Sequence, residues 1–166
     1  MDLDVCCLKF VMNCDLLFGF IGSGLLGFLT EQGPFRATNK DLSLTWNDYS
    51  WNKIANMVFI EQPCGVGFSY TDDENSDDYT NNDAQAAKDN YALIQGFLDR
   101  FPQFRSNDLY VTSESYGGHY IPMVSKEIVD RNTAGQDTAL NFKGFFLGKT
   151  LTIADCIIRS SVSALR

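Results

Sequence analysis

Basic residues and histidine are scarce in this sequence. Thirteen lysines and arginines stand against 21 aspartates and glutamates in 166 residues, which leaves a formal charge of -8, and His119 is the one histidine. Nucleic-acid affinity depends on lysine and arginine neutralising phosphates, so the composition disfavours a nucleic-acid partner. The five cysteines include no C-x-x-C pair, and a single imidazole is available to join them. We therefore expect no metal site, and nothing in the composition calls for a cofactor.

Long hydrophobic runs are absent as well. The longest weakly polar run, Leu16 to Leu29, has 14 residues and four of them are glycines, whereas a transmembrane helix needs about 20 apolar residues. Asp2 and Asp4 stand where a signal peptide would carry basic residues. We expect no membrane span and find no convincing signal peptide. The odd number of cysteines leaves the cellular compartment open.

The remaining sequence predicts alternating strands and helices. Short β-branched runs predict strands, and apolar residues at steps of three and four predict helices. Asp83 is expected to cap the first helix, and Pro102 to end it. The acidic stretch before that helix lacks the glycine and closing glutamate of a calcium loop, so we interpret it as a solvated loop. This order predicts a parallel α/β sheet with crossover helices, with strands at 56–60, 109–112 and 142–147 and helices at 83–101 and 121–130.

Several apolar side chains have simple structural interpretations. Phe142, Phe145 and Phe146 are expected in the core of the sheet, and Trp46 and Trp51 are expected to pack a loop. Cys64 follows Pro63 in the turn that leads from the predicted first strand into a loop. We interpret it as a buried thiol rather than a reactive one.

Ser115 lies at the predicted junction between the second strand and the second helix. In the nucleophile elbow of α/β-hydrolases, small residues two before and two after the serine let the chain turn sharply and lift the hydroxyl above the sheet. Those positions are Ser113 and Gly117 here. Ser113 replaces a glycine, and serine tolerates positive φ poorly, so we expect strain or a shifted turn. The pattern indicates a nucleophilic serine, although so short a motif also occurs by chance.

A longer series of segments resembles the serine carboxypeptidase family. The resemblance covers roughly residues 24 to 148, and its segments follow one another in the family's order. They are GFLTEQGPF (27–35), YSWN (49–52), NMVFIEQPCGVGFSY (56–70), FPQF (101–104), ESYGGHYIP (114–122) and NFKGFFLG (141–148).

The resemblance implies an α/β-hydrolase-like fold and a serine-type carboxypeptidase, which releases C-terminal residues from peptides or proteins through an acyl-enzyme. Ser115 takes the nucleophile position, and the backbone N–H of Tyr116 takes an oxyanion-hole position. Glu31 and Glu114 fall on a carboxyl pair that binds the terminal carboxylate of the substrate. Two close carboxyls cannot both ionise cheaply, so one is expected to keep its proton and donate a hydrogen bond. The implied location is secreted, vacuolar or lysosomal.

One departure from the family lies in its glycine-rich segment, Trp-Leu-Asn-Gly-Gly-Pro-Gly-Cys-Ser-Ser. This segment supplies the second oxyanion donor and falls on residues 15–24. Gly19 and Ser23 agree with it, whereas Leu17 and Phe18 replace its asparagine and first glycine. Gly19 is the candidate for the second donor, although its bulky neighbours argue against the required close backbone approach.

The other departure concerns the aspartate and the histidine of the Ser-Asp-His triad that the family uses. The family's catalytic aspartate and histidine lie beyond the third strand, but this sequence leaves the pattern at Lys149. His119 follows Ser115 by four residues on the same helix, where the family carries a histidine that is not the base. We expect an aggregation-prone, weakly active or inactive form. The expected domain is a single incomplete, truncated α/β-hydrolase domain over residues 1–166, with divergent ends at 1–23 and 149–166.

Three alternative functions stay open to different degrees. A non-catalytic peptide-binding fragment and an acyltransferase both fit the same residues, because hydrolysis and transfer share an acyl-enzyme. Dinucleotide binding is suggested by the G-x-G-x-x-G of residues 22–27. Gly33-Pro34 shortens the helix that should follow to less than two turns, and no second strand ends in an acidic residue at the ribose distance. The dinucleotide hypothesis is therefore disfavoured.

Overall fold

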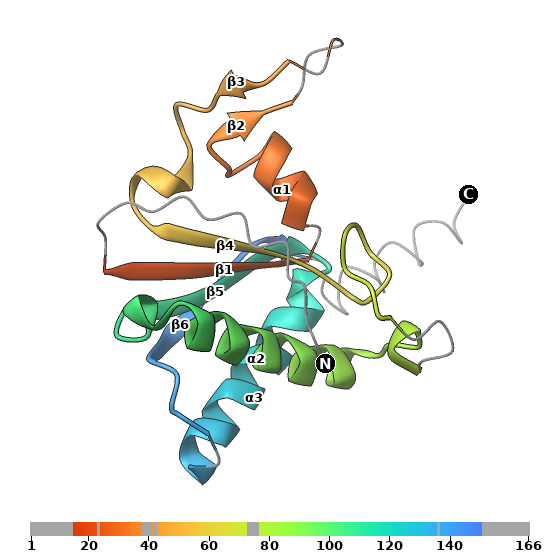
Figure 1. The fold of residues 1–166 in the computed structure, drawn as a ribbon, viewed down its shortest axis with the longest axis vertical. Coiled ribbons are helices and arrows are strands. Elements are labelled where there is room, and N and C mark those ends of the chain that lie inside the picture. Colours follow the sequence, from red (N-terminus) through yellow and green to blue (C-terminus); the bar gives the residue numbers. More distant parts are fainter. Residues whose placement is uncertain are drawn as a thin grey trace, which may run out of the picture.

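A four-stranded parallel sheet forms the centre of the molecule. The computed structural model describes residues 15–22, 24–37, 41, 43–72, 77–135 and 137–150. The spatial order of the strands is β4-β1-β5-β6, and every neighbouring pair is parallel (Figure 1). This confirms the predicted mostly parallel α/β sheet. The strands are β1 (Leu16–Gly22), β4 (Asn56–Glu61), β5 (Asp108–Ser115) and β6 (Phe142–Thr150).

Helices cover both faces of this sheet. Short helix α1 (Gly24–Thr30) lies on one face, which we call the α1 face, together with the two-stranded ribbon of β2 (Phe35–Arg36) and β3 (Thr45–Trp46) (Figure 1). Helices α2 (Asp83–Arg100) and α3 (Gly117–Ala134) lie on the opposite face, which we call the helical face. Three 3₁₀ turns complete the described chain: η1 (Trp51–Lys53), η2 (Asp77–Tyr79) and η3 (Pro102–Phe104).

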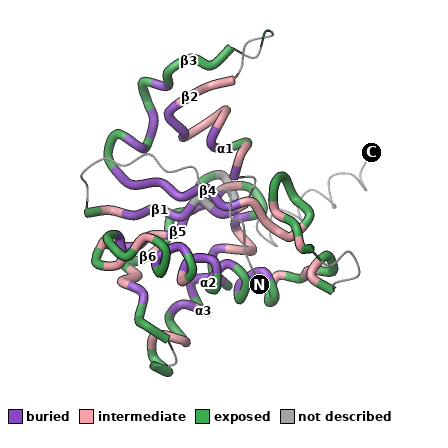
Figure 2. Tube along the Cα trace, viewed as in Figure 1, coloured by how far each residue is buried: buried purple, intermediate pink, exposed green. Residues whose placement is uncertain are grey.

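The side chains of each strand alternate between the two faces and build two separate cores. The buried residues in Figure 2 follow β4, β1 and β5 and recur along α2 and α3. On the helical face, Leu17, Ile21, Val58, Ile60, Leu109 and Val111 pack with Ile94, Leu98, Ile121, Val124 and Ile128. On the α1 face, Met57 and Phe59 pack with Ala55 and Phe28. Full burial of one such side chain contributes about 1.5–3 kcal/mol to stability.

The ends of α2 and α3 follow from local signals. Asn82, and not Asp83, is the N-cap of α2, because its side chain accepts a hydrogen bond from the Gln85 N–H at 2.9 Å. Asp83 is the first helical residue, where its charge still favours the positive end of the helix. Helix α3 begins at Gly117, where the elbow motif predicts the start of a helix, four residues before the apolar spacing that begins at Ile121. It ends at Ala134, and the next residue, Gly135, has a φ of 65°, the left-handed conformation common after helices.

Two packing predictions are wrong. Phe145 and Phe146 are 47% and 49% exposed instead of lying in the core, because β6 is an outer strand that α3 and the Tyr110 ring cover only in part. Trp46 is 72% exposed, and its main partner is the Phe35 ring at 4.7 Å across the β2–β3 ribbon. Strand β1, which was not among the predicted strands, is one of the two inner strands of the sheet.

Candidate active site

Ser115 stands in the turn that joins β5 to α3. Strand β5 ends at Ser115, and α3 begins at Gly117. The φ of Ser115 is 52°, the only positive φ of a non-glycine residue in the described chain. Ser115 is exposed, and it lies at the carboxyl end of β5. The predicted strand-to-helix junction is confirmed, although β5 continues three residues beyond the predicted Thr112.

Ser113 and Gly117 explain how the chain makes this turn. A Cβ on Gly117 would lie 2.2 Å from Ser113 Oγ and 2.3 Å from Ser113 Cβ, so a larger residue would push α3 away from β5. Ser113 is buried, and its hydroxyl donates to the carbonyl of Ile21 at 2.5 Å. The strain expected in the elbow lies at Ser115, the residue with the positive φ. The Ser113 side chain bridges β5 to β1.

Helix α3 points its N-terminus at Ser115. Tyr116 is its N-cap and makes no side-chain capping bond, and its carbonyl accepts the first bond of the helix from His119 N at 2.9 Å. The first N–H groups of a helix lack intrahelical partners and carry partial positive charge. Negative charge that develops on an oxygen beside Ser115 would be stabilised there. The Tyr116 backbone N–H, the predicted oxyanion donor, belongs to this turn.

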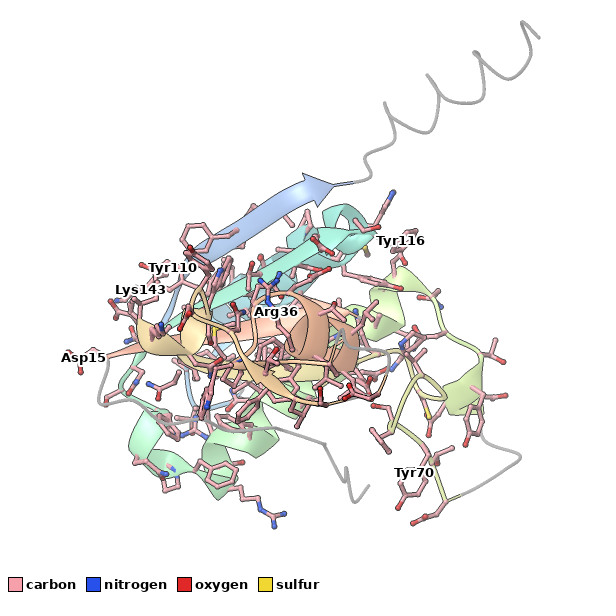
Figure 3. The ribbon with its side chains drawn as sticks, turned by 90° about the horizontal axis from the view of Figure 1, so that it is seen from above. Asp15, Arg36, Tyr70, Tyr110, Tyr116 and Lys143 are labelled. Atoms are coloured by element: carbon pink, nitrogen blue, oxygen red, sulfur yellow. The ribbon has the colours of Figure 1, made fainter. Side chains whose placement is uncertain are left out.

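His119 is held in an aromatic cluster on α3. Its ring stacks on Tyr116 with centroids 4.6 Å apart, and the Tyr120 ring packs edge-on against Tyr116 at 4.9 Å. Burial, followed by the neighbouring Tyr116, raises the pKa of the Tyr120 hydroxyl. In Figure 3, Tyr116 lies at the opposite end of the sheet from Asp15 and Lys143. The cluster therefore sits at the carboxyl end of the strands, beside Ser115.

Glu31 and Glu114 belong to the same face of the sheet. Glu31 follows α1 directly and is half-buried. Its carboxylate accepts a hydrogen bond from Gln32 Nε2 at 3.1 Å. Glu114 precedes Ser115 in β5, where Leu109 and Val111 face the helical side. Because strand side chains alternate, Tyr110 and Glu114 face the α1 side. The fold thus brings both carboxyl residues to the α1 face.

Glu61 is a structural anchor of this region that the sequence did not reveal. Its carboxylate accepts from Leu25 N at 3.3 Å and from Phe68 N at 2.7 Å. Its carbonyl accepts from Ser69 Oγ at 2.6 Å. A Cβ on Gly67, which has a φ of 57°, would lie 2.0 Å from the Glu61 carboxylate. Glu61 therefore ties the end of β4 to the first turn of α1 and to the following loop, and an acidic residue ending an apolar strand was the available signal.

Gly19 is not brought to the elbow. It lies buried in the middle of β1, where it pairs with Val58 and Val111. Val111 precedes Ser115 by four residues, which corresponds to about 13 Å along a strand. Gly22, at the end of β1, is closer to the turn, because a Cβ placed on it would be 3.5 Å from Ser113 Oγ. Ser23 lies outside the described residues.

The structure argues against dinucleotide binding and offers no metal centre in its described part. Helix α1, which follows the G-x-G-x-x-G segment, has seven residues, too few for the helix of a dinucleotide fold. Among the residues that the structure describes, no group of three or more histidine, cysteine or acidic side chains is placed to hold a metal ion. In the same residues, no helix has both the length and the apolar character needed to cross a bilayer.

Cys64 is half-buried and unpaired among the described cysteines, the other four lying outside the described residues. Burial, followed by the charge of Asp78, raises the pKa of its thiol. A raised pKa lowers the fraction of reactive thiolate at neutral pH. This agrees with the interpretation of Cys64 as a structural thiol.

The sequence of this chain is similar to that of a known family of proteins. Residues 20–163 match the family model described as serine carboxypeptidase. The chain belongs to the serine carboxypeptidase family. Among its relatives, serine carboxypeptidase-like 47 of Arabidopsis thaliana is 41% identical over 130 residues, which are 78% of this chain and 25% of the relative. Serine carboxypeptidase-like 33 of the same plant is 45% identical over 128 residues, 76% of this chain and 26% of the relative. The chain thus spans about a quarter of the length of these relatives.

A solved carboxypeptidase structure supports the fold. The crystal structure of Kex1(delta)p, a prohormone-processing carboxypeptidase from Saccharomyces cerevisiae, matches with a TM-score of 0.77 and 24% sequence identity. The match covers 100% of this chain and 39% of that one. At this identity the likeness concerns the fold alone. This member of the family therefore has an α/β-hydrolase-like fold, of which the described residues form a part.

Proposed function

We propose that this chain supplies the nucleophile and the carboxylate-binding residues of a serine-type carboxypeptidase, which releases C-terminal residues from peptides or proteins. The observation that carries the proposal is the position of Ser115, exposed, with a φ of 52°, directly before an 18-residue helix. A strained residue in an exposed turn at a helix N-terminus is a common setting for a nucleophile. Family membership supports the same reaction class.

In the proposed reaction, Ser115 Oγ attacks the carbonyl carbon of the last peptide bond. The bond to the terminal residue breaks, that residue leaves as a free amino acid, and water then hydrolyses the acyl-enzyme. The Tyr116 N–H stabilises the oxyanion. For the second donor we propose the backbone at the end of β1, where Gly22 lies, in place of Gly19.

The base that accepts the proton of Ser115 is not assigned to His119. That imidazole stacks on Tyr116 within the nucleophile helix, whereas a triad base approaches the hydroxyl from a separate loop. Without a base, the serine hydroxyl stays protonated at its ordinary pKa and is a weak nucleophile. A polypeptide of residues 1–166 is therefore expected to be a poor peptidase.

Recognition of the substrate carboxylate is proposed for Glu31 and Glu114. Support comes from their common face of the sheet and from the position of Glu114 next to Ser115. At close range one carboxyl keeps its proton and donates a hydrogen bond to the substrate anion. Such a pair works best in acid, which suits a secretory, vacuolar or lysosomal location.

The test measures hydrolysis of a blocked dipeptide by residues 1–166, by the Ser115→Ala variant and by a full-length member of the family. We expect residues 1–166 to be at least about 10³-fold slower than the full-length enzyme, since loss of triad groups leaves only residual transition-state binding. A full rate that Ser115→Ala abolishes would show that a base is present within these residues. An added alcohol acceptor separates acyl transfer from hydrolysis, because both reactions pass through the acyl-enzyme.

The recognition half is tested by binding. The dissociation constant of a blocked peptide with a free C-terminal carboxylate is compared with that of its C-terminal amide. We expect residues 1–166 to prefer the free acid, and Glu31→Gln to reduce the preference, because a fixed amide cannot replace a shared proton. Equal affinity for acid and amide would contradict carboxylate recognition and leave catalysis to be judged by the rate assay.

A further inference from the structure

We propose that Asn47 is a positioning residue for Glu31. Its side chain fixes the turn that carries Glu31, so that the Glu31 carboxyl meets a substrate carboxylate at a defined place. The inference rests on the proposed role of Glu31 in carboxylate recognition. It adds a residue that lies 16 positions further along the chain and outside every motif considered above.

Asn47 is buried and uses all of its polar groups. It is 4% exposed, and its Nδ2 donates to the carbonyls of Glu31 and Gly33, both at 2.9 Å. Its Oδ1 accepts from Tyr49 N at 3.1 Å, and its own N–H donates to Pro34 O at 2.9 Å. A buried carboxamide that bridges two carbonyls of one turn holds that turn in a single conformation.

The turn needs such support because α1 is short. A helix of seven residues is marginal without tertiary contacts. After it, Glu31 N and Gln32 N share the carbonyl of Gly27 at 3.2 Å and 3.0 Å. The chain then folds back so tightly that a Cβ on Gly33 would lie 1.9 Å from Phe28 O.

Three successive carbonyls of this turn are tied to the segment 47–51. Asn47 holds the first and third, those of Glu31 and Gly33, and Trp51 N donates to the second, that of Gln32, at 3.0 Å. The Glu31 side chain leaves the chain at the start of this clamp, and Gln32 Nε2 donates a hydrogen bond to its carboxylate. Removal of the Asn47 carboxamide releases two of the three carbonyls and lets Glu31 move.

The experiment compares Asn47→Ala with Asn141→Ala. Asn141 makes a similar bridge, since its Nδ2 donates to the carbonyls of Ser106 at 3.0 Å and Asn107 at 3.1 Å, but it lies at the amino end of β6. The chain of residues 1–166 is titrated with a blocked peptide as free acid and as C-terminal amide. Unfolding in urea is followed for each variant, so that loss of stability is measured separately.

We expect Asn47→Ala to lower the ratio of the amide and acid dissociation constants about tenfold, which corresponds to one oriented hydrogen bond to a charged group. Asn141→Ala is expected to leave this ratio unchanged. A purely structural role would weaken acid and amide equally. Preference within about twofold of the unmodified chain in folded Asn47→Ala would overturn the proposal. If the unmodified chain shows no preference, the proposed carboxylate recognition has failed and this inference fails with it, while the rate assay still judges the proposed nucleophile.

A second variant covers the case in which Asn47→Ala does not fold. In Asn47→Ser the side chain stays polar, but one short hydroxyl cannot bridge two carbonyls. It is expected to lower the acid preference in the same direction, and full preference in folded Asn47→Ser would also overturn the proposal.

Discussion

Ser115 occupies a backbone conformation that serine rarely adopts. The left-handed region costs a non-glycine residue of order 1 kcal/mol or more, and Ser115 has a φ of 52°. Its neighbour two residues earlier compensates in part, since Ser113 Oγ donates to Ile21 O within the core. The strain therefore persists because packing on both sides of Ser115 defines the turn.

Ser115→Gly is expected to stabilise the chain. Glycine adopts positive φ without the steric cost, so the free energy of unfolding should rise by about 1 kcal/mol, while the proposed nucleophile is lost. Urea denaturation monitored by circular dichroism measures the change. Ser113→Ala is the control of opposite sign, with an expected loss of about 1–2 kcal/mol because the Ile21 carbonyl is left unpaired. A Ser115→Gly variant less stable than the unmodified chain would contradict strain at the elbow.

At the junction between β5 and α3, the backbone of Gly117 packs directly against the Ser113 side chain. Gly117 is the first residue of α3, and only its missing Cβ allows the helix to approach Ser113. Alanine is a better helix former than glycine by about 1 kcal/mol. The observed glycine thus reflects packing against the strand and not a preference of the helix.

Gly117→Ala is expected to lower the free energy of unfolding by about 2 kcal/mol, because the added methyl overlaps Ser113 Oγ and Cβ. In a Ser113→Gly background the overlapping atoms are gone. There the same change should be neutral or stabilising, since helix propensity then decides. A double-mutant cycle by urea denaturation gives the coupling energy. Equal effects of Gly117→Ala in both backgrounds would show that this contact does not determine the junction.

At the scale of the whole molecule, the two outer strands of the described sheet, β4 and β6, differ in how deeply their side chains are buried. Beside β4, α1 packs with Phe28 against Met57 and Phe59. At the other side, β6 is the last described strand, and its Phe145 and Leu147 are 47% and 36% exposed. Residues two apart in a strand lie on one face, so these side chains form a shared apolar surface. Exposed apolar surface at a strand edge favours self-association.

Phe145→Lys is expected to weaken self-association of residues 1–166 by about tenfold or more, since burial of one phenylalanine contributes about 1.5–3 kcal/mol. Sedimentation velocity over a range of concentrations measures the association constant. Leu44→Lys is the matched control, because Leu44 is 59% exposed but lies beside the β2–β3 ribbon, away from β6. Self-association that Leu44→Lys reduces as much as Phe145→Lys would argue against β6 as the contact surface.

The sequence by itself determined the elements whose signals are contiguous. The apolar run of β4, the helical spacing of α2 with its stop at Pro102, and the small residues around Ser115 each act over a few neighbouring positions. Such local preferences can be read from the sequence because the residues that cause them are neighbours in the chain. The family resemblance, carried by segments in a fixed order, added the reaction class and the roles of Ser115, Glu31 and Glu114, and these roles stay predictions.

Only the tertiary structure decided which distant groups meet. Strand β1 has a glycine-interrupted sequence and becomes an inner strand because β4 and β5 pair with it on both sides. The register of those pairs places Gly19 away from the elbow. Glu61 reaches Leu25 across 36 residues, and Asn47 reaches Glu31 across 16. Hydrogen bonds over such separations leave no local pattern, because either partner is an ordinary polar residue until the fold buries it beside the other.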